Sequence, residues 1–210
     1  MLNRGLAAGL IAAALAGAVL AACGDDDDGG TLTAVGTGTT PTTTTPHAAA
    51  SAVPEGVAAQ YATLEEEIAE EGGSVESGDW RIAYIKEPAE GWFHMDQGHM
   101  VWRDPARGET AHLEVIPIER STGRIVPDAR ITLEVLDEAG GRVERKQLSF
   151  YYAEFFHYAE NFSIPASGEY TLRASVEAPA FRRHGDAKEG PALMEDARVE
   201  FENVMIDIDG

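Results

Sequence analysis

The stretch YTLRASVE, Tyr170 to Glu177, decides the fold class. Its apolar side chains stand at every second position, Tyr170, Leu172, Ala174 and Val176, with polar side chains between them. Successive side chains of a β-strand point to opposite faces, so this alternation is typical of a strand that buries one face and exposes the other. Strands of this kind usually belong to antiparallel sheets that pack one face on a core.

Similar runs fill most of the chain after residue 80, separated by turn-forming stretches at 121–123, 137–141 and 165–168. Around seven short strands with this punctuation predict an all-β fold, an immunoglobulin-like antiparallel β-sandwich. The predicted strands cover 81–85, 100–103, 110–118, 129–136, 142–150, 169–176 and 198–206.

A different period precedes the strands. Val57, Tyr61, Leu64 and Ile68 recur at helical spacing, and the glycine pair at 72–73 is a stop signal. We therefore predict a short N-terminal helix with its lead-in over 55–76 and a β-sandwich domain over 77–210.

The N-terminus has the pattern of a secretory signal. Arg4 precedes an apolar run over 5–22, which ends in small residues directly before Cys23. The pattern resembles a bacterial lipobox and predicts a lipoprotein signal peptide over 1–22, with Cys23 lipidated as the first mature residue. A plain transmembrane anchor is the alternative, but about 18 apolar residues are marginal for a span. The expected location is the cell envelope, extracytoplasmic and lipid-anchored to the membrane.

Residues 23–54 are rich in Asp, Thr and Pro and nearly free of large apolar side chains. Such a segment buries too little surface to offset the entropy of ordering, so we predict a disordered tether after the lipidated cysteine. Cys23 is the only cysteine, so the domain has no internal disulfide and depends on its core.

The formal net charge of −20 argues against nucleic acid, whose phosphates require a basic surface, and favours cations as partners. Solubility at a charged surface explains the same acidity. The sequence has no GxSxG, no HExxH, no phosphate-binding loop and no cysteine nucleophile within the domain, so we predict that the protein is not an enzyme.

Within the predicted strand, the run AHLEV places His112 and Glu114 two residues apart and therefore on one face. Their Cβ atoms are expected about 7 Å apart, a span that a single cation can bridge. A surface ion pair between the two is the alternative.

Other histidines have metal-competent or aromatic neighbours. A neutral imidazole is the commonest metal ligand, and a thioether favours copper. A single histidine beside aromatics is more often structural. The side chains concerned are His94, Met95, His99 and Met100 in FHMDQGHM, His157 in EFFHYAEN and His184 in FRRHGD.

The segments HLEV, HYAENFSIPASGEYTLRASVEAP and FRRHGD, in this order, resemble the periplasmic ferrous-iron-uptake accessory family, which includes a metal-binding spirochaete lipoprotein. The resemblance covers roughly residues 78–186. It implies an immunoglobulin-like sandwich, a homodimer, and work beside an iron permease in the inner membrane.

The resemblance also implies the ligands. His112 and Glu114 would come from the first strand, His157 from a His-Tyr turn and His184 from an Arg-His loop. Together they would hold a divalent cation, copper in some relatives, near a second site proposed for iron. Members often have a methionine shortly before the His-Tyr histidine, whereas this chain has Phe-Tyr-Tyr at 150–152.

Met95 or Met100, with His94 and His99, are candidates for an additional metal contact in place of that methionine. An ordinary hairpin with incidental sulfur is the alternative. Without a thioether, His and Glu ligands bind copper(II), zinc or ferrous iron.

The sequence leaves two further features open. Glu154, Glu160 and Asp186 form either an outer iron-collecting site or solvated turns, and the aromatic run 150–158 is either core and dimer contact or a metal shield.

The sequence thus predicts a lipoprotein that binds a divalent transition-metal cation, iron and/or copper, and assists ferrous-iron uptake through a membrane permease. Three alternatives remain at this point: a metal-free immunoglobulin-like surface interaction module, a copper-handling protein, and a copper-dependent redox enzyme.

Overall fold

The structure, a computed structural model, describes residues 53–188 and 190–208. The predicted signal peptide over 1–22, the lipidation at Cys23 and nearly all of the tether over 23–54 lie outside the described residues. Among the described residues, no helix is long and apolar enough to cross a membrane.

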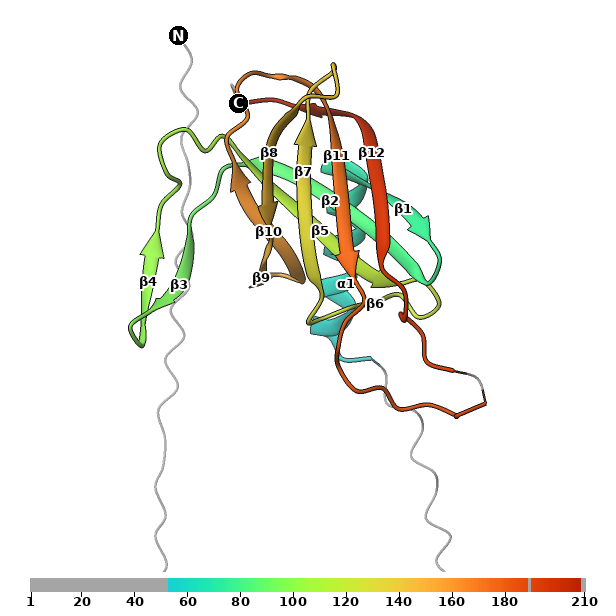
Figure 1. The fold of residues 1–210 in the computed structure, drawn as a ribbon. Coiled ribbons are helices and arrows are strands. Elements are labelled where there is room, and N and C mark those ends of the chain that lie inside the picture. The colour runs from blue at the N-terminus through green and yellow to red at the C-terminus, as the bar shows by residue number, and fades with distance from the viewer. Residues whose placement is uncertain (1–52, 189, 209–210) are drawn as a thin grey trace, which may run out of the picture. The chain divides into compact units, whose positions relative to one another are not determined.

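Two antiparallel sheets face each other, and a two-stranded hairpin stands beside them (Figure 1). The six-stranded sheet has the order β1-β2-β5-β10-β9, with β6 paired to β5, and the four-stranded sheet has the order β12-β11-β7-β8. The first sheet comprises β1 (Gly72–Ser77), β2 (Trp80–Pro88), β5 (Ala111–Glu119), β6 (Arg124–Ile125), β9 (Ser149–Tyr152) and β10 (Phe156–Phe162). The second comprises β7 (Arg130–Leu136), β8 (Arg142–Gln147), β11 (Gly168–Glu177) and β12 (Ala197–Ile206), and the hairpin comprises β3 (Trp92–Asp96) and β4 (His99–Arg103).

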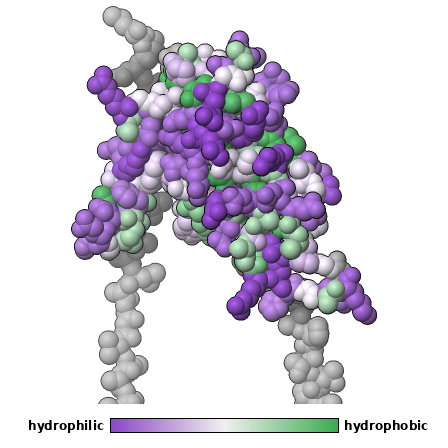
Figure 2. All heavy atoms as spheres, in the orientation of Figure 1, coloured by the Kyte–Doolittle hydropathy of each residue, from purple (hydrophilic) through white to green (hydrophobic). Residues whose placement is uncertain are grey.

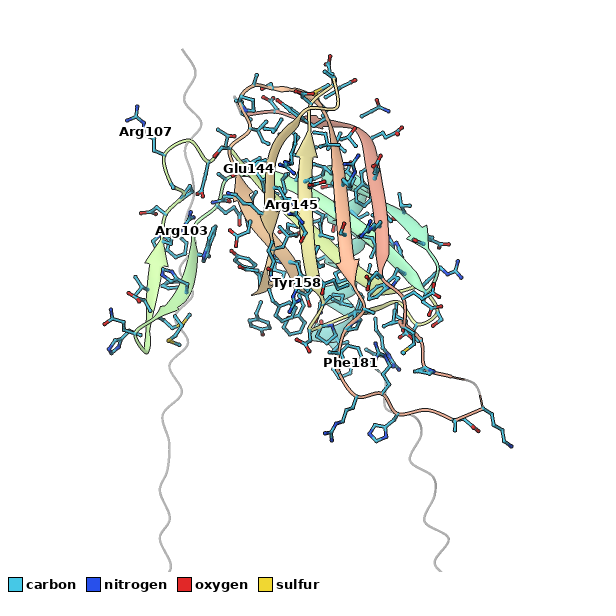
Figure 3. The ribbon with its side chains drawn as sticks, in the orientation of Figure 1. Arg103, Arg107, Glu144, Arg145, Tyr158 and Phe181 are labelled. Carbon is cyan, nitrogen blue, oxygen red and sulfur yellow. The ribbon has the colours of Figure 1, made fainter. Side chains whose placement is uncertain are left out.

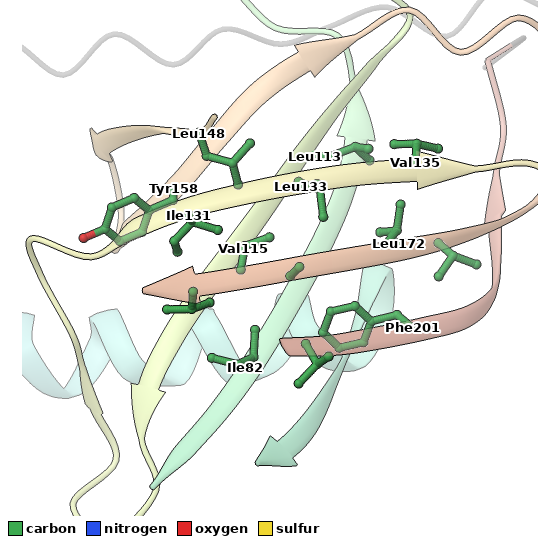
Figure 4. Packing of buried hydrophobic residues seen from close by; sticks show 14 of the residues in the cluster. Ile82, Leu113, Val115, Ile131, Leu133, Val135, Leu148, Tyr158, Leu172 and Phe201 are labelled. Atoms are coloured by element: carbon green, nitrogen blue, oxygen red, sulfur yellow. The ribbon is translucent and has the colours of Figure 1, made fainter. Parts of the chain in front are cut away.

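The main core lies between the two sheets. Alternate side chains of facing strands meet there, among them Leu113, Val115, Leu133 and Leu172 (Figure 4). The opposite face of the four-stranded sheet is mostly hydrophilic (Figure 2), with ion pairs such as Arg173–Glu200 across its strands. The predicted all-β, immunoglobulin-like sandwich with a short N-terminal helix is confirmed.

A second, smaller core lies on the outer face of the six-stranded sheet. Helix α1 (Glu55–Glu71) packs Leu64 and Ile68 there, in the same buried cluster as Ile116 and Ile118 of β5. Strand β5 is therefore buried on both faces, including His112 and Glu114, although its sequence predicts one polar face.

The strand predicted over 142–150 is wrong in one respect, because two strands of different sheets occupy it. Leu148 lies between β8 and β9, donates its backbone N–H to Ile131 O at 2.9 Å and buries its side chain in the main core. The prediction of a turn at His157 is also wrong, since His157 lies within β10. Strands β1, β3, β6 and β10 were not predicted. In β1, a Cβ atom at Gly72 would lie 1.9 Å from Tyr84 O, so the residue that stops the helix also permits the pairing with β2.

The packing of the main core gives a stability prediction. Leu133→Ala removes a fully buried side chain and should lower the free energy of unfolding by about 2–5 kcal/mol. Thr132→Ala changes the neighbouring, half-buried residue on the other face and should cost less than about 1 kcal/mol. Urea denaturation measures both, and equal losses would contradict the assignment of faces.

Candidate metal centre

Three side chains meet on the outer face of the six-stranded sheet. His112 and Glu114 project from β5, and His157 projects from the neighbouring strand β10. In the register, Ala159 lies opposite Glu114, so His157 is the diagonal neighbour of Glu114. The small side chain of Ala159 leaves room for the imidazole beside the carboxyl group.

The three groups have the geometry of a metal site. Glu114 Oε1 lies 3.9 Å from His112 Nε2 and 3.5 Å from His157 Nε2. One ligand atom from each residue lies within 4.8 Å of the others, and no other such group of three occurs among the described residues. Tetrahedral ligands at metal distances of 2.0–2.2 Å lie about 3.4 Å apart, so these side chains fit one cation after small shifts.

Asn161 orients His112. Its Nδ2 donates to Glu90 O at 2.7 Å and to Glu109 Oε2 at 3.2 Å, and since both partners are acceptors, the amide orientation is fixed. Asn161 Oδ1 therefore accepts a hydrogen bond from His112 Nδ1 at 2.9 Å. This places the proton on Nδ1 and leaves the lone pair of Nε2 directed at Glu114, the arrangement that metal-binding histidines need.

Further hydrogen bonds hold Glu109, which accepts from Asn161. Glu109 accepts hydrogen bonds from Arg103 at 2.6 Å and from Ala106 N at 2.7 Å. Burial opposes ionisation of Glu109, but these donors and Asn161 outweigh it and lower its pKa to about 2. The guanidinium of Arg103 lies 4.2 Å from the ring centre of Trp92, at the base of the hairpin (Figure 3). Asn161 is therefore held by a carboxylate that stays ionised at neutral pH.

Aromatic rings close the centre. Tyr151 of β9 pairs with His157 across the strands and stacks on its imidazole, with ring centres 5.4 Å apart. Trp92 meets the edge of Tyr151 at 5.5 Å and lies 6.2 Å from the ring of His112. The Phe-Tyr-Tyr segment thus places an aromatic ring, and no sulfur, against His157.

Burial governs the charges of the centre. It raises the pKa of Glu114 to about 9, with help from the charges of Glu87, Glu67 and Glu90. Burial also lowers the pKa of His112, and burial with the charge of His112 lowers that of His157 to about 4. At neutral pH the carboxyl group is therefore protonated and both imidazoles are neutral. Glu114 Oε2, the other oxygen of this carboxyl group, is buried and has no hydrogen-bond partner among the described residues, so the group has room for a further interaction.

Carboxylates that the sequence analysis did not single out surround the centre. Glu87 of β2 lies opposite His112 in the register, Glu90 follows that strand, and Glu67 is near the end of α1. Burial, and repulsion by neighbouring carboxylates, raise the pKa values of Glu67 and Glu87. In the sequence these carboxylates stand in the acidic runs LEEEI and KEPAE, which could have indicated a negatively charged region. Only the fold brings both runs beside β5.

Of the three carboxylates proposed for an outer site, Glu154 contributes to the charge around Glu67. Glu160 accepts a hydrogen bond from Ser149 Oγ at 2.7 Å, and Asp186 lies in an exposed loop. These three side chains form no joint group among the described residues.

A cavity of about 670 Å³ leads to the centre. His112, His157 and Tyr151 line it from the sheet, and His94 and Met100 line it from the hairpin. Met95 and His99 are exposed near the hairpin tip.

His184 is not brought to the centre. It is exposed on the loop between β11 and β12 and lines a different cavity, together with Arg182 and Arg183. Its role as a ligand stays a prediction.

The model of the family described as "Fe2+ transport protein" matches residues 103–205, a segment that contains β5 and β10 and so all three clustered side chains. The chain belongs to the Fe2+ transport protein family. No curated protein sequence is significantly similar to it.

Solved structures share the fold. A copper-bound variant of FetP from uropathogenic Escherichia coli strain F11 is 18% identical, with a TM-score of 0.50, and the match covers 66% of this chain and 94% of that one. Copper-reconstituted P19 from Campylobacter jejuni is 22% identical, with a TM-score of 0.49 and coverage of 64% and 94%. FetP isolated after expression in the E. coli periplasm is 19% identical, with a TM-score of 0.49 and coverage of 65% and 96%.

The raised pKa of Glu114 predicts a pH-dependent stability. The folded, metal-free chain keeps the Glu114 proton up to about pH 9, whereas the unfolded chain loses it near pH 4.5. The contribution of this group to stability is complete below pH 4.5 and is lost as the pH rises towards 9, by up to about 1.4 kcal/mol per pH unit. Urea unfolding with chelator present should therefore show falling stability between pH 7 and 8.5.

Glu114→Gln is the matched control, because it keeps the shape of the neutral carboxyl group and cannot ionise. Its stability should change much less across the same interval. His112 and His157 add little there, since lowered pKa values leave them neutral in both states above their ordinary value of 6.5. Identical slopes for the two proteins would contradict a buried, protonated Glu114.

Proposed function

We propose that the protein binds a divalent transition-metal cation, iron and/or copper, and passes it to a membrane permease for ferrous-iron uptake. The main support for this proposal is the buried group of His112, Glu114 and His157, whose ligand atoms all lie within 4.8 Å of one another. Two imidazoles and one carboxylate suit ferrous iron, copper(II) and zinc. Membership of the Fe2+ transport protein family favours iron among them.

Ligand exchange fits this centre better than catalysis. The three ligands from one chain leave one position of a tetrahedron for a further ligand, and the cavity beside His112 and His157 gives access to it. A cation that binds displaces the proton of Glu114, and a proton that returns weakens the site. Capture and release then need no chemical change of the cargo, and we propose no catalytic turnover.

The acidic surroundings favour capture. Glu67, Glu87 and Glu90 repel the ionised form of Glu114, so a divalent cation relieves repulsion that the metal-free centre avoids only by holding a proton. Clustered negative charge also concentrates cations near the cavity.

We propose that the chain acts outside the cytoplasmic membrane as a lipoprotein. The signal pattern over 1–22 and its small residues before Cys23 support export and lipidation. A tether over 23–54 would let the lipid-anchored domain approach a permease in the same membrane.

Metal binding tests the proposal directly. The mature chain with Cys23→Ser is prepared without a His tag, stripped with chelator and titrated anaerobically with ferrous iron, copper(II) and zinc. We expect one tightly bound cation per chain. The double variant His112→Ala and His157→Ala should lose about 100-fold or more in affinity, and Asn161→Ala about 10-fold to 100-fold, because it frees the ring of His112.

His99→Ala is the matched control, since it removes an exposed imidazole that does not line the cavity. Its divalent affinity should equal that of the parent chain. If no cation binds stoichiometrically, or if the double variant binds as well as the control, the centre is not a metal site and a surface interaction module becomes the better description.

We also propose a homodimer in which the partner subunit's His184 completes the centre. Within one chain His184 lies apart from the other ligands. Phe150, Tyr152 and Phe156 are exposed, and the first two line the mouth of the same cavity, where a second chain would cover them.

Mixed dimers test this arrangement. His157→Ala and His184→Ala chains should each bind the cation weakly. When they are unfolded together and refolded, random pairing restores one complete centre in each mixed dimer, and so about a quarter of the tight sites. If mixing restores none, His184 is not a ligand from the second chain.

A further inference from the structure

The hairpin of β3 and β4 carries a feature that the buried centre does not use. In the described part of the chain, these two strands pair with each other and with neither sheet. A two-residue turn joins them, and Gln97 and Gly98 both have positive φ, 45° and 86°. This is the backbone of a tight hairpin turn, and it fixes which side chains share a face.

The turn places the two hairpin methionines side by side. Met95 pairs with Met100, so both thioethers leave the same face, with Cβ atoms about 4.5–5.5 Å apart. Both side chains are exposed, by 64% and 61%. Neither contributes to a core, although methionine is an apolar residue that cores readily accept.

The hairpin does not need these methionines for its own packing. Phe93 and Trp102, the next pair on the same face, contact each other with ring centres 4.9 Å apart. At the base, Trp102 Nε1 donates to Asp104 at 2.7 Å. The two exposed thioethers are therefore available to a ligand.

We propose that Met95 and Met100 form a copper(I) site, separate from the buried centre. Thioethers are soft, uncharged ligands that select copper(I), whereas zinc and ferrous iron prefer the nitrogen and oxygen ligands of the buried centre. Copper(I) accepts two or three ligands, so two opposed methionines suffice. His94 alternates with Met95 along β3 and so lies on the opposite face of the hairpin, and it is not part of this site.

The location gives the site a role. Met100 lines the same cavity as His112 and His157. Copper(I) held by the hairpin therefore lies beside the route to the buried centre. The family match begins at residue 103, after both methionines, so the site is an addition to the matched segment. Capture at the hairpin is independent of the proposed function, and only onward transfer rests on it.

Copper(I) stoichiometry tests the site. The mature chain with Cys23→Ser is titrated anaerobically with copper(I), kept reduced and competed with bicinchoninate. Met95→Leu with Met100→Leu should bind one equivalent fewer than the parent and keep the same zinc affinity. Met194→Leu with Met205→Leu is the matched control, because it removes two methionines of similar exposure, 59% and 53%, and should lose nothing.

A variant of the buried centre separates the two sites. His112→Ala with His157→Ala should keep one equivalent of copper(I), and its copper K-edge absorption should show sulfur ligands. If this variant binds no copper(I), or binds it without sulfur, the hairpin site is overturned, whatever the divalent titrations show. Equal copper(I) binding by the parent and by the Met95 and Met100 double variant would overturn it as well.

Discussion

Glu114 is 4% exposed and its carboxyl group lies between two imidazoles, so the structure around it must neutralise or compensate its charge. An isolated carboxylate inside a protein is costly, so the group must take a proton or a cation. The nearby carboxylates Glu67, Glu87 and Glu90 make the ionised form still less favourable without a cation. A divalent cation bound there would satisfy the carboxyl group and both Nε2 atoms at once. The same burial that keeps Glu114 protonated in the metal-free chain therefore prepares the centre to exchange a proton for a metal.

The fold produces this burial by dividing the outer face of one sheet. Helix α1 covers Ile116 and Ile118 of β5, while the base of the hairpin and Tyr151 of β9 cover His112 and His157. The centre lies between α1 on one side and the hairpin base with Tyr151 on the other. Its side chains are buried, and His112 and His157 line the cavity. Asn161 then fixes the ring of His112, so the ligand atoms are oriented before any cation arrives.

Local patterns predicted part of this arrangement. Alternation in 170–177 and 111–115 predicted the sandwich and the shared face of His112 and Glu114. It could not show that α1 and the hairpin bury that face, because this depends on contacts distant in sequence. His157 was singled out through a family resemblance, yet its strand was missed, since the aromatic run 150–158 has no clean alternation. The role of Asn161 depends on its register opposite His112, which no local pattern contains. The order of the family-like segments predicted His184 as a ligand, but the fold of one chain does not bring it to the centre. Segments that match a family in sequence need not lie together within one chain.

The cavity is lined by His112 and His157 of the sheet and by Met100 of the hairpin. If the proposed hairpin site binds copper(I), the chain separates copper(I) from divalent cations by ligand type. The central claim is that His112, Glu114 and His157 hold the divalent cation. Anomalous diffraction from a crystal of the zinc-loaded or ferrous-loaded chain, measured at the absorption edge of that metal, tests it most directly. The account predicts one strong peak between His112 Nε2, His157 Nε2 and the Glu114 carboxylate. A principal peak on exposed carboxylates, with none between these three side chains, would contradict it.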